Sequence, residues 1–271
     1  MILTVRHATR YLYSAPMRGA VQSLRLFPSR FEGQNTRHWQ VEVESGIRGA
    51  SFVDGAGDRI EGWSMRGPLN EVCVRVEGEV ETHDLNGVLR GHREAVPAAA
   101  YLRSTPATLP DAALSALAEA AVAGAQEALE RAHRLSAAVA KAITYRPGAT
   151  HAHTTAAESL ALGEGVCQDH AHALIAAANV VGLPARYVSG YLFADAEGVA
   201  HEAAHAWAEI WLEGLGWVGF DAANACCPDD RYIRLGSGRD AQEAAPIRGL
   251  ALGQGSAEKL EVEVAVGASQ Q

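Results

Sequence analysis

The second half of the chain gathers residue types that can do chemistry around one cysteine. Cys167 lies within a segment, residues 151 to 205, that holds six of the eleven histidines. A thiol beside a protonated imidazole can become a nucleophile, because such neighbours lower its pKa from about 8.5 to about 3.5–7.5. Cysteine and histidine also bind zinc, and a lone cysteine is often a small buried apolar residue. The cluster therefore allows a thiol nucleophile, a zinc site, or no chemistry.

Cys167 is placed where a helix is predicted to begin. Gly163 and Gly165 precede it, and the apolar residues that follow recur at helical spacing until Gly182 and Pro184 end the pattern. A thiol in the first turn lies near the positive end of the helix dipole, which favours the thiolate. The backbone N–H of Cys167 can also hold the oxyanion of a tetrahedral intermediate. This segment predicts Cys167 as a nucleophile.

The base and its orienting carboxylate are predicted on a hairpin. The segment HAWAEIWLEGLGWVGFD, residues 205 to 221, has the period of two strands with a turn at residues 214 to 216. Antiparallel pairing brings its first residue, His205, beside its last, Asp221. A carboxylate-held imidazole can act as general base and acid for a thiol. We therefore expect a catalytic triad of Cys167, His205 and Asp221.

The letters HEAAH at residues 201 to 205 raise the alternative of a zinc metalloprotease. That motif needs a helix, but the alternation after His205 indicates a strand. On a strand, His201 and His205 would lie about 13 Å apart, at 3.2–3.4 Å per residue. The extended motif needs a third histidine at position 211, where this chain has Trp211. We therefore expect no metal and no organic cofactor.

The elements that must position these residues follow a strand-rich region. Period-2 patterns predict five early strands, at residues 3–13, 20–28, 37–45, 59–65 and 71–81. Two alanine-rich segments predict helices, at residues 111–126 and 127–145. Later strands are expected at residues 185–193, 204–213, 216–221 and 259–266. The change in composition near residue 86 marks a domain boundary.

Taken together, the motifs resemble the bacterial branch of the transglutaminase-like superfamily. The resemblance is carried by GEGVCQDHAH, GLPARYVSGYL, HAWAEIWL, GWVGFD and GRD, in the Cys, His, Asp order of that family's triad. The opening VRHATRYLYSAPMRGAVQSLRLFP resembles the β-rich N-terminal domain of these proteins. The resemblance implies an α+β fold. We expect a small β-sandwich domain at residues 1–85 from the strand patterns. The resemblance implies that it precedes a papain-like transglutaminase core at 86–271, with its motifs at 145–250 and helices packed on an antiparallel sheet.

Residues near the triad match the family only in part. Gln168, Asp169 and His172 occupy family positions, where each could cap the helix, brace a loop or touch substrate. Ala222 and Ala223 replace the family's Pro-Thr after the aspartate, which frees the local backbone. Three further histidines are expected on the surface: His151, His153 and His170. Trp207 and Trp217 are expected either to line an acyl-binding groove or to belong to the core. Cys226 and Cys227 are expected either to form a redox pair or to pack against neighbouring residues.

The composition and the N-terminal sequence argue against two kinds of binding partner. A net charge of −9 argues against nucleic acid, whose binding depends on Lys and Arg. The N-terminus lacks a signal-peptide pattern and no 18-residue apolar run follows, so we expect no membrane partner and a cytoplasmic location with reduced thiols.

The expected function is cysteine-dependent acyl transfer on peptide or glutamine-type amides through a thioester. Hydrolysis is slightly favoured over amine cross-linking, because no residue indicates a bound amine acceptor. The alternative is a non-catalytic peptide-binding or assembly module that keeps the three residues as structure. The sequence does not indicate an oligomeric state.

Overall fold

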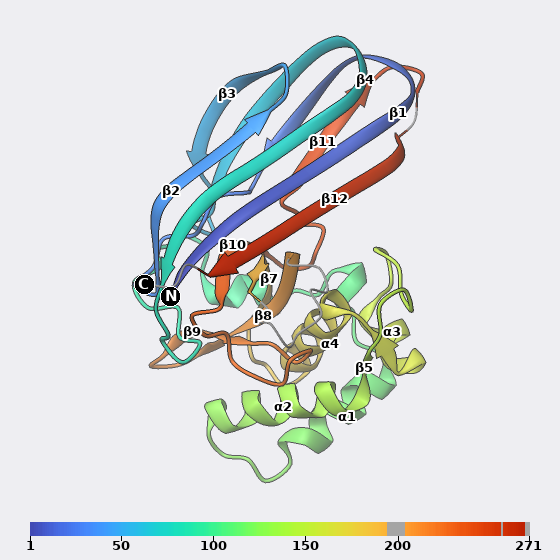
Figure 1. Cartoon of the computed structure of the whole chain (residues 1–271). Coiled ribbons are helices and arrows are strands. Elements are labelled where there is room, and N and C mark those ends of the chain that lie inside the picture. The colour runs from blue at the N-terminus through green and yellow to red at the C-terminus, as the bar shows by residue number, and fades with distance from the viewer. Residues whose placement is uncertain (194–203, 256, 269–271) are drawn as a thin grey trace.

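The structure is a computed structural model that describes residues 1–193, 204–255 and 257–268. It has two parts (Figure 1): a sheet of long strands, and a smaller sheet covered by helices. None of the helices in these ranges is both long and apolar enough to cross a membrane.

The first part is one antiparallel sheet of six strands. They are β1 (Ile2–Leu24), β2 (Gln34–Val43), β3 (Gly46–Val53), β4 (Arg59–Thr82), β11 (Ile247–Leu252) and β12 (Ala257–Ala268). Strands β1 and β4 pair along most of their length; β12 and β2 flank one half of this pair, and β11 and β3 flank the other. The first two predicted strands are joined in β1 and the last two in β4, while β3 was not predicted.

The two halves of this sheet share one hydrophobic core. The pairing of β1 with β4 shifts register between Leu12 and Met17, where the ladder is interrupted. Leu3 and Val74 from one half, and Leu24 and Trp63 from the other, belong to the same buried cluster. The strand-rich N-terminal region is therefore confirmed. It differs from the expected sandwich in that hydrogen bonds join all of its strands into one sheet.

The last two strands of the chain join this N-terminal sheet. β11 and β12 both pair with β1, so residues 247–268, which the sequence assigned to the catalytic region, lie in the first part of the molecule. The period-2 pattern of residues 259–266 predicts a strand but carries no information about its partner. A boundary at residue 85 therefore does not separate this sheet from the rest of the chain.

The second part is a four-stranded antiparallel sheet with helices packed on it, as the resemblance implied. Its strand order is β10-β7-β8-β9, with bounds Tyr232–Gly238, Ala185–Leu192, Ala204–Leu212 and Gly216–Phe220. The helices are α1 (Ala112–Val122), α2 (Ala128–Ala142), α3 (Ala156–Leu162) and α4 (Cys167–Val180). Short elements connect them: η1 (Ala98–Leu102), η2 (Pro106–Thr108), β5 (Thr144–Tyr145) and β6 (Glu164–Gly165).

Helix α4 and strand β8 form the centre of this part. Ala173, Ala176 and Ala177 of α4 are fully buried in one cluster with Ala208 and Ile210 of β8. Small side chains let the helix approach the sheet closely, so the start of α4 is held firmly beside the sheet. The alternate residues of β8, including Trp207 and Glu209, point to the opposite face of the sheet.

A chain of buried ion pairs joins the two parts. Arg234 Nη1 lies 3.1 Å from Asp58 Oδ1, and Arg234 Nε lies 2.9 Å from Glu209 Oε1. Glu209 Oε2 in turn lies 2.7 Å from Arg186 Nε, and Arg186 also pairs with Glu94. A buried charge without a partner is costly, so these pairs must remain together when the two parts pack. They fix β8 relative to the N-terminal sheet.

Candidate active site

Cys167 is the first residue of α4, as the sequence predicted. The residue before it, Val166, donates its backbone N–H to Asp169 Oδ2 at 2.8 Å, and Thr150 Oγ1 donates to the same oxygen at 2.6 Å. A Cβ on Gly165 would lie 2.7 Å from Asp169 Cβ, so only glycine fits beside this carboxylate. Asp169 thus caps the helix and fixes the turn that carries the thiol.

The hairpin of β8 and β9 brings His205 and Asp221 together. His205 Nε2 lies 2.6 Å from Asp221 Oδ2, and both side chains are nearly buried, with 8% and 1% of their surface exposed. A hydrogen bond this short between an imidazole and a buried carboxylate is typical of a charge-assisted pair. In the hairpin, Ala208 pairs with Phe220. The next residue after β9, Asp221, therefore comes to lie diagonally across from His205.

The His205 ring also interacts with the Cys167 side chain. Burial disfavours a charged ring, but the hydrogen bond to Asp221 and its charge, together with a contribution from the Cys167 side chain, raise the pKa of His205 to about 10. Since Nε2 is taken by Asp221, the ring nitrogen left for the thiol is Nδ1. The arrangement favours an imidazolium at neutral pH that is hydrogen-bonded to Asp221 and close enough to Cys167 to be affected by it.

The turn after Asp221 is well held although it lacks the family's proline. Asp221 Oδ1 accepts the backbone N–H groups of Ala223 and Asn224 at 3.0 and 3.2 Å. Asn224 Nδ2 donates to Oδ2 at 2.7 Å. Two backbone hydrogen bonds between Asp221 and Cys226 close the turn. Hydrogen bonds therefore replace the rigidity that the proline would supply.

Sequence reasoning missed Tyr232. Its hydroxyl donates to Asp221 Oδ2 at 2.9 Å from β10, a strand that the sequence analysis did not predict. Its ring packs edge-on against Trp207, with ring centroids 5.5 Å apart, and Trp207 lies nearly parallel to the His205 ring. The aromatic period-2 segment YIRLGSG could have indicated this strand, but nothing local could have shown that its tyrosine reaches Asp221.

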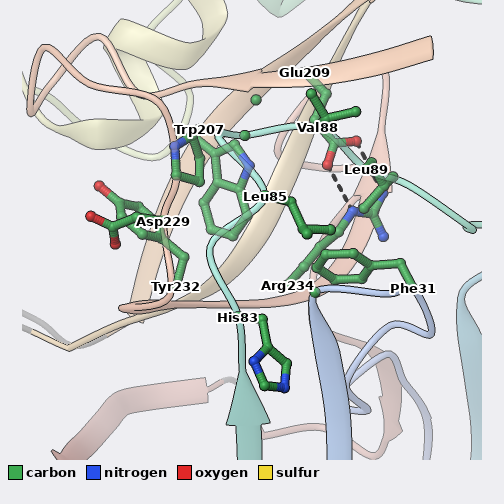
Figure 2. Close-up of a pocket in the computed structure, with 14 residues that line it drawn as sticks. Phe31, His83, Leu85, Val88, Leu89, Trp207, Glu209, Asp229, Tyr232 and Arg234 are labelled. Carbon is green, nitrogen blue, oxygen red and sulfur yellow. Dashed lines mark hydrogen bonds and ion pairs between the residues drawn. The ribbon is translucent and has the colours of Figure 1, made fainter. Parts of the chain in front are cut away.

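A pocket lies on the far side of this aromatic pair (Figure 2). Trp207 and Tyr232 form one wall, and Leu85 and Val88 are among the apolar residues that face them. The ion pair of Glu209 and Arg234 also lines the pocket. Its empty volume, mouth included, is about 430 Å³. Cys167, His205 and Asp221 do not line it, so the pocket lies behind Trp207 and Tyr232 and not at the thiol.

The other histidines of the cluster have different surroundings. His151 and His153 are exposed, as expected. The surface prediction for His170 is wrong: it is 2% exposed, and its ring nitrogens lie 2.9 Å from the carbonyl oxygens of Val166 and Ile143. Such bonds satisfy carbonyl groups near the start of α4 and the end of α2. The second of these carbonyls is distant in the sequence, so the polar residues around His170 do not indicate that its ring is buried.

His172, Trp217 and Gln168 form hydrogen bonds to other parts of the chain. His172 Nε2 accepts the backbone N–H of Ala241 at 3.0 Å, and burial lowers the pKa of His172 to about 4 despite nearby carboxylates. Trp217 packs in the core and donates its indole N–H to Glu94 at 2.6 Å. Gln168 donates its side-chain amide to the Ala152 carbonyl at 3.2 Å. These residues brace the elements around the triad.

The remaining predictions concern the cysteines and the possible metal motif. All four cysteines are free thiols, and Cys226 and Cys227 are both partly buried. Among residues 1–193, 204–255 and 257–268, no three His, Cys, Asp or Glu side chains are grouped to hold a metal ion. His205 lies on a strand, as expected, while His201 of the HEAAH motif lies outside the described residues.

Known proteins resemble this chain along most of its length. An uncharacterized protein of Mycobacterium leprae is 29% identical over 94% of both chains. An uncharacterized protein of Mycobacterium tuberculosis is 41% identical over 40% of this chain and 37% of its own length. The crystal structure of a candidate cysteine protease from Cytophaga hutchinsonii superposes with a TM-score of 0.73 at 20% identity, covering 100% of this chain and 93% of that one. That similarity establishes the fold.

Two family descriptions match adjoining regions of the chain. The bacterial transglutaminase-like N-terminal region matches residues 3–81, and the transglutaminase-like superfamily matches residues 115–222, which include Cys167, His205 and Asp221. The second match spans helices α1 to α4 and strands β7 to β9, the elements that surround these three residues. The chain is therefore a member of the transglutaminase-like superfamily that carries the bacterial N-terminal region.

Proposed function

We propose that this protein catalyses acyl transfer from peptide or glutamine-type amides through a thioester on Cys167. The observation that carries the proposal is the 2.6 Å contact of His205 with Asp221, on a ring that also interacts with the Cys167 thiol at the start of α4. An imidazole that is held by a carboxylate and faces a thiol favours the thiolate–imidazolium pair.

The proposed reaction assigns one role to each residue. The Cys167 thiolate attacks the amide carbonyl carbon, and the carbonyl electrons move to an oxyanion beside the Cys167 N–H. His205 gives its proton to the nitrogen as the C–N bond breaks, leaving a thioester and a free amine or ammonia. His205 then removes a proton from water, whose oxygen attacks the thioester carbon; the C–S bond breaks, the carboxylic acid leaves, and the Cys167 thiolate and His205 imidazolium are restored. Asp221 orients the ring and stabilises its charge.

Hydrolysis is the favoured outcome over amine cross-linking. A transferase must bind and orient an amine so that it outcompetes water at the thioester. The pocket behind Trp207 and Tyr232 does not include the thiol in its lining, so it does not supply such an acceptor site. The test is to offer glutamine-containing peptides with a labelled amine. Ammonia or peptide release without incorporation of the label supports hydrolysis, and incorporation supports cross-linking.

Alkylation of the thiol separates an enzyme from a binding module without knowledge of the substrate. Burial raises the pKa of Cys226 and of Cys227, and Cys73 is 2% exposed, so iodoacetamide below pH 7 should label Cys167 selectively. Cys167→Ser measures the background, and His205→Ala should abolish the low-pH labelling. Labelling that begins only above pH 8 in the unaltered protein would instead support the non-catalytic module.

A further inference from the structure

The carboxylate of Asp221 holds more donors than a triad needs. Its Oδ2 accepts from His205 at 2.6 Å, from Asn224 Nδ2 at 2.7 Å and from Tyr232 Oη at 2.9 Å, while Oδ1 accepts two backbone N–H groups. Asp221 is 1% exposed and Tyr232 is 5% exposed. Each donor competes with the imidazole for the same negative charge.

The direction of the hydrogen bond from Tyr232 can be worked out. An ionised carboxylate only accepts, so the Tyr232 hydroxyl must donate to Asp221. The Cys226 sulfur lies 3.4 Å from the same hydroxyl oxygen, whose proton is already used, so the thiol is the donor in that contact. Burial raises the pKa of Tyr232, which keeps this hydroxyl protonated. A fixed chain of donors thus runs from Cys226 through Tyr232 to Asp221.

We propose that Tyr232 is a positioning residue that weakens the effect of the Asp221 charge on the His205 imidazolium, so that the ring gives its Nδ1 proton more readily to the leaving amine. The inference rests on the proposed acyl-transfer function. A carboxylate with fewer donors would bind the imidazolium more tightly and make it a poorer acid. Tyr232 acts through charge and not as the anchor of Asp221, because the two backbone donors and Asn224 hold the carboxylate without it.

Within residues 1–193, 204–255 and 257–268, few titratable side chains lie close to His205. Those that face the ring and its carboxylate are Cys167 from α4 and Tyr232 from β10, with Cys226 behind Tyr232. Beyond Cys226, Asp229 and Arg231 pair with each other, with 2.7 Å between Oδ2 and Nη2. The Trp207 ring, which does not titrate, lies nearly parallel to the His205 ring. A change confined to the Tyr232 hydroxyl therefore acts on His205 through Asp221.

The variant Tyr232→Phe removes only the hydroxyl. NMR titration of the His205 ring, assigned by its loss in His205→Ala, should show a pKa about 0.5 to 1 unit higher than in the unaltered protein, as expected for losing one hydrogen bond to an ionised group. Peptide hydrolysis should become about three- to tenfold slower in kcat, with KM unchanged, because the proton is released less readily. The alkaline limb of the pH–rate profile should move up with the titration.

Tyr191→Phe is the matched control, since Tyr191 is 1% exposed and its hydroxyl bonds to His7 Nδ1 at 2.7 Å, away from Asp221. This control should leave the His205 titration unchanged. Should Tyr232→Phe fail to fold, 3-fluorotyrosine at position 232 keeps the fold; its more acidic hydroxyl is a stronger donor and should lower the pKa of His205. An unchanged titration, or a shift of opposite sign in either protein, overturns the inference.

These results separate the two proposals. The His205 titration does not depend on turnover, so a shifted titration in a protein without thiol reactivity would leave the effect on Asp221 intact and overturn the proposed function. An active protein in which Tyr232→Phe changes neither the titration nor kcat would overturn only the role of Tyr232.

Discussion

Replacing Asp221 with asparagine should remove the charge that keeps the His205 ring protonated. The pKa of His205 is about 10 against an ordinary 6.5, a difference of 10 − 6.5 = 3.5 units, and the bond to Asp221 is the first of the groups that raise it. An opposite charge in direct contact typically shifts a pKa by about 1 to 3 units, so this interaction is worth about 1.4 to 4 kcal/mol at 1.36 kcal/mol per unit. Little solvent screens the pair, because only 8% and 1% of the two side chains are exposed.

The same substitution should also change the tautomer of the ring. In Asp221→Asn, an amide that keeps its oxygen on the Ala223 and Asn224 N–H groups turns its NH₂ toward His205 Nε2. The neutral ring would then carry its proton on Nδ1, facing the thiol, and could not accept the thiol proton. Low-pH alkylation of Cys167 should therefore fall by a factor of about 100 or more.

The assay is the rate of Cys167 alkylation by iodoacetamide from pH 5 to 10, together with NMR titration of His205. Asp229→Asn is the matched control, because Asp229 pairs with Arg231 and its substitution should leave both measurements unchanged. The pH dependence of stability should follow the same group. A raised folded pKa stabilises the protein fully below pH 6.5, and this contribution is lost as pH rises toward 10, so Asp221→Asn should narrow its stability deficit over that range. An alkylation profile identical to that of the unaltered protein would refute this reasoning.

Three further perturbations test the support of the site. Asp169→Ala removes the cap of α4 and should lower the free energy of unfolding by about 1 to 2 kcal/mol in urea denaturation, with slower low-pH alkylation of Cys167. Glu209→Gln breaks the buried ion-pair chain and should cost about 3 to 5 kcal/mol, whereas Arg37→Ala, at an exposed pair, should change stability by less than about 1 kcal/mol. Although burial opposes it, the charges of Arg234 and Arg186 lower the pKa of Glu209 to about 2, so its contribution is complete above about pH 4.5 and lost as pH falls toward 2. The stability deficit of Glu209→Gln, measured by urea denaturation, should therefore be complete above about pH 4.5 and shrink as pH falls toward 2.

Local sequence patterns were sufficient to assign Cys167, His205 and Asp221 to their helix and hairpin. The glycines before Cys167 and the helical spacing after it predict a helix that begins at the thiol, and α4 begins there. The alternation after His205 and the turn before Asp221 predict a hairpin, and its register brings the two side chains to 2.6 Å. Both predictions depend on residues close in sequence, where spacing alone fixes geometry.

Contacts between distant segments could not be predicted in this way. The ring of His170 is hydrogen-bonded to the carbonyl of Ile143, 27 residues away, and the hydroxyl that donates to Asp221 comes from Tyr232, on a strand whose local pattern carries no information about its contacts. The pairing of β11 and β12 with β1 joins the two ends of the chain, although each strand taken alone is compatible with either sheet.

The sequence by itself determined the superfamily, the start of the helix at Cys167 and the hairpin of His205 and Asp221, because periodicity and turn residues act over a few positions. Only the tertiary structure decided how many donors Asp221 holds, which sheet receives the last strands and how buried charges join the two parts. These features depend on which surfaces become buried against each other, and burial is a property of the whole folded chain and not of any segment of it.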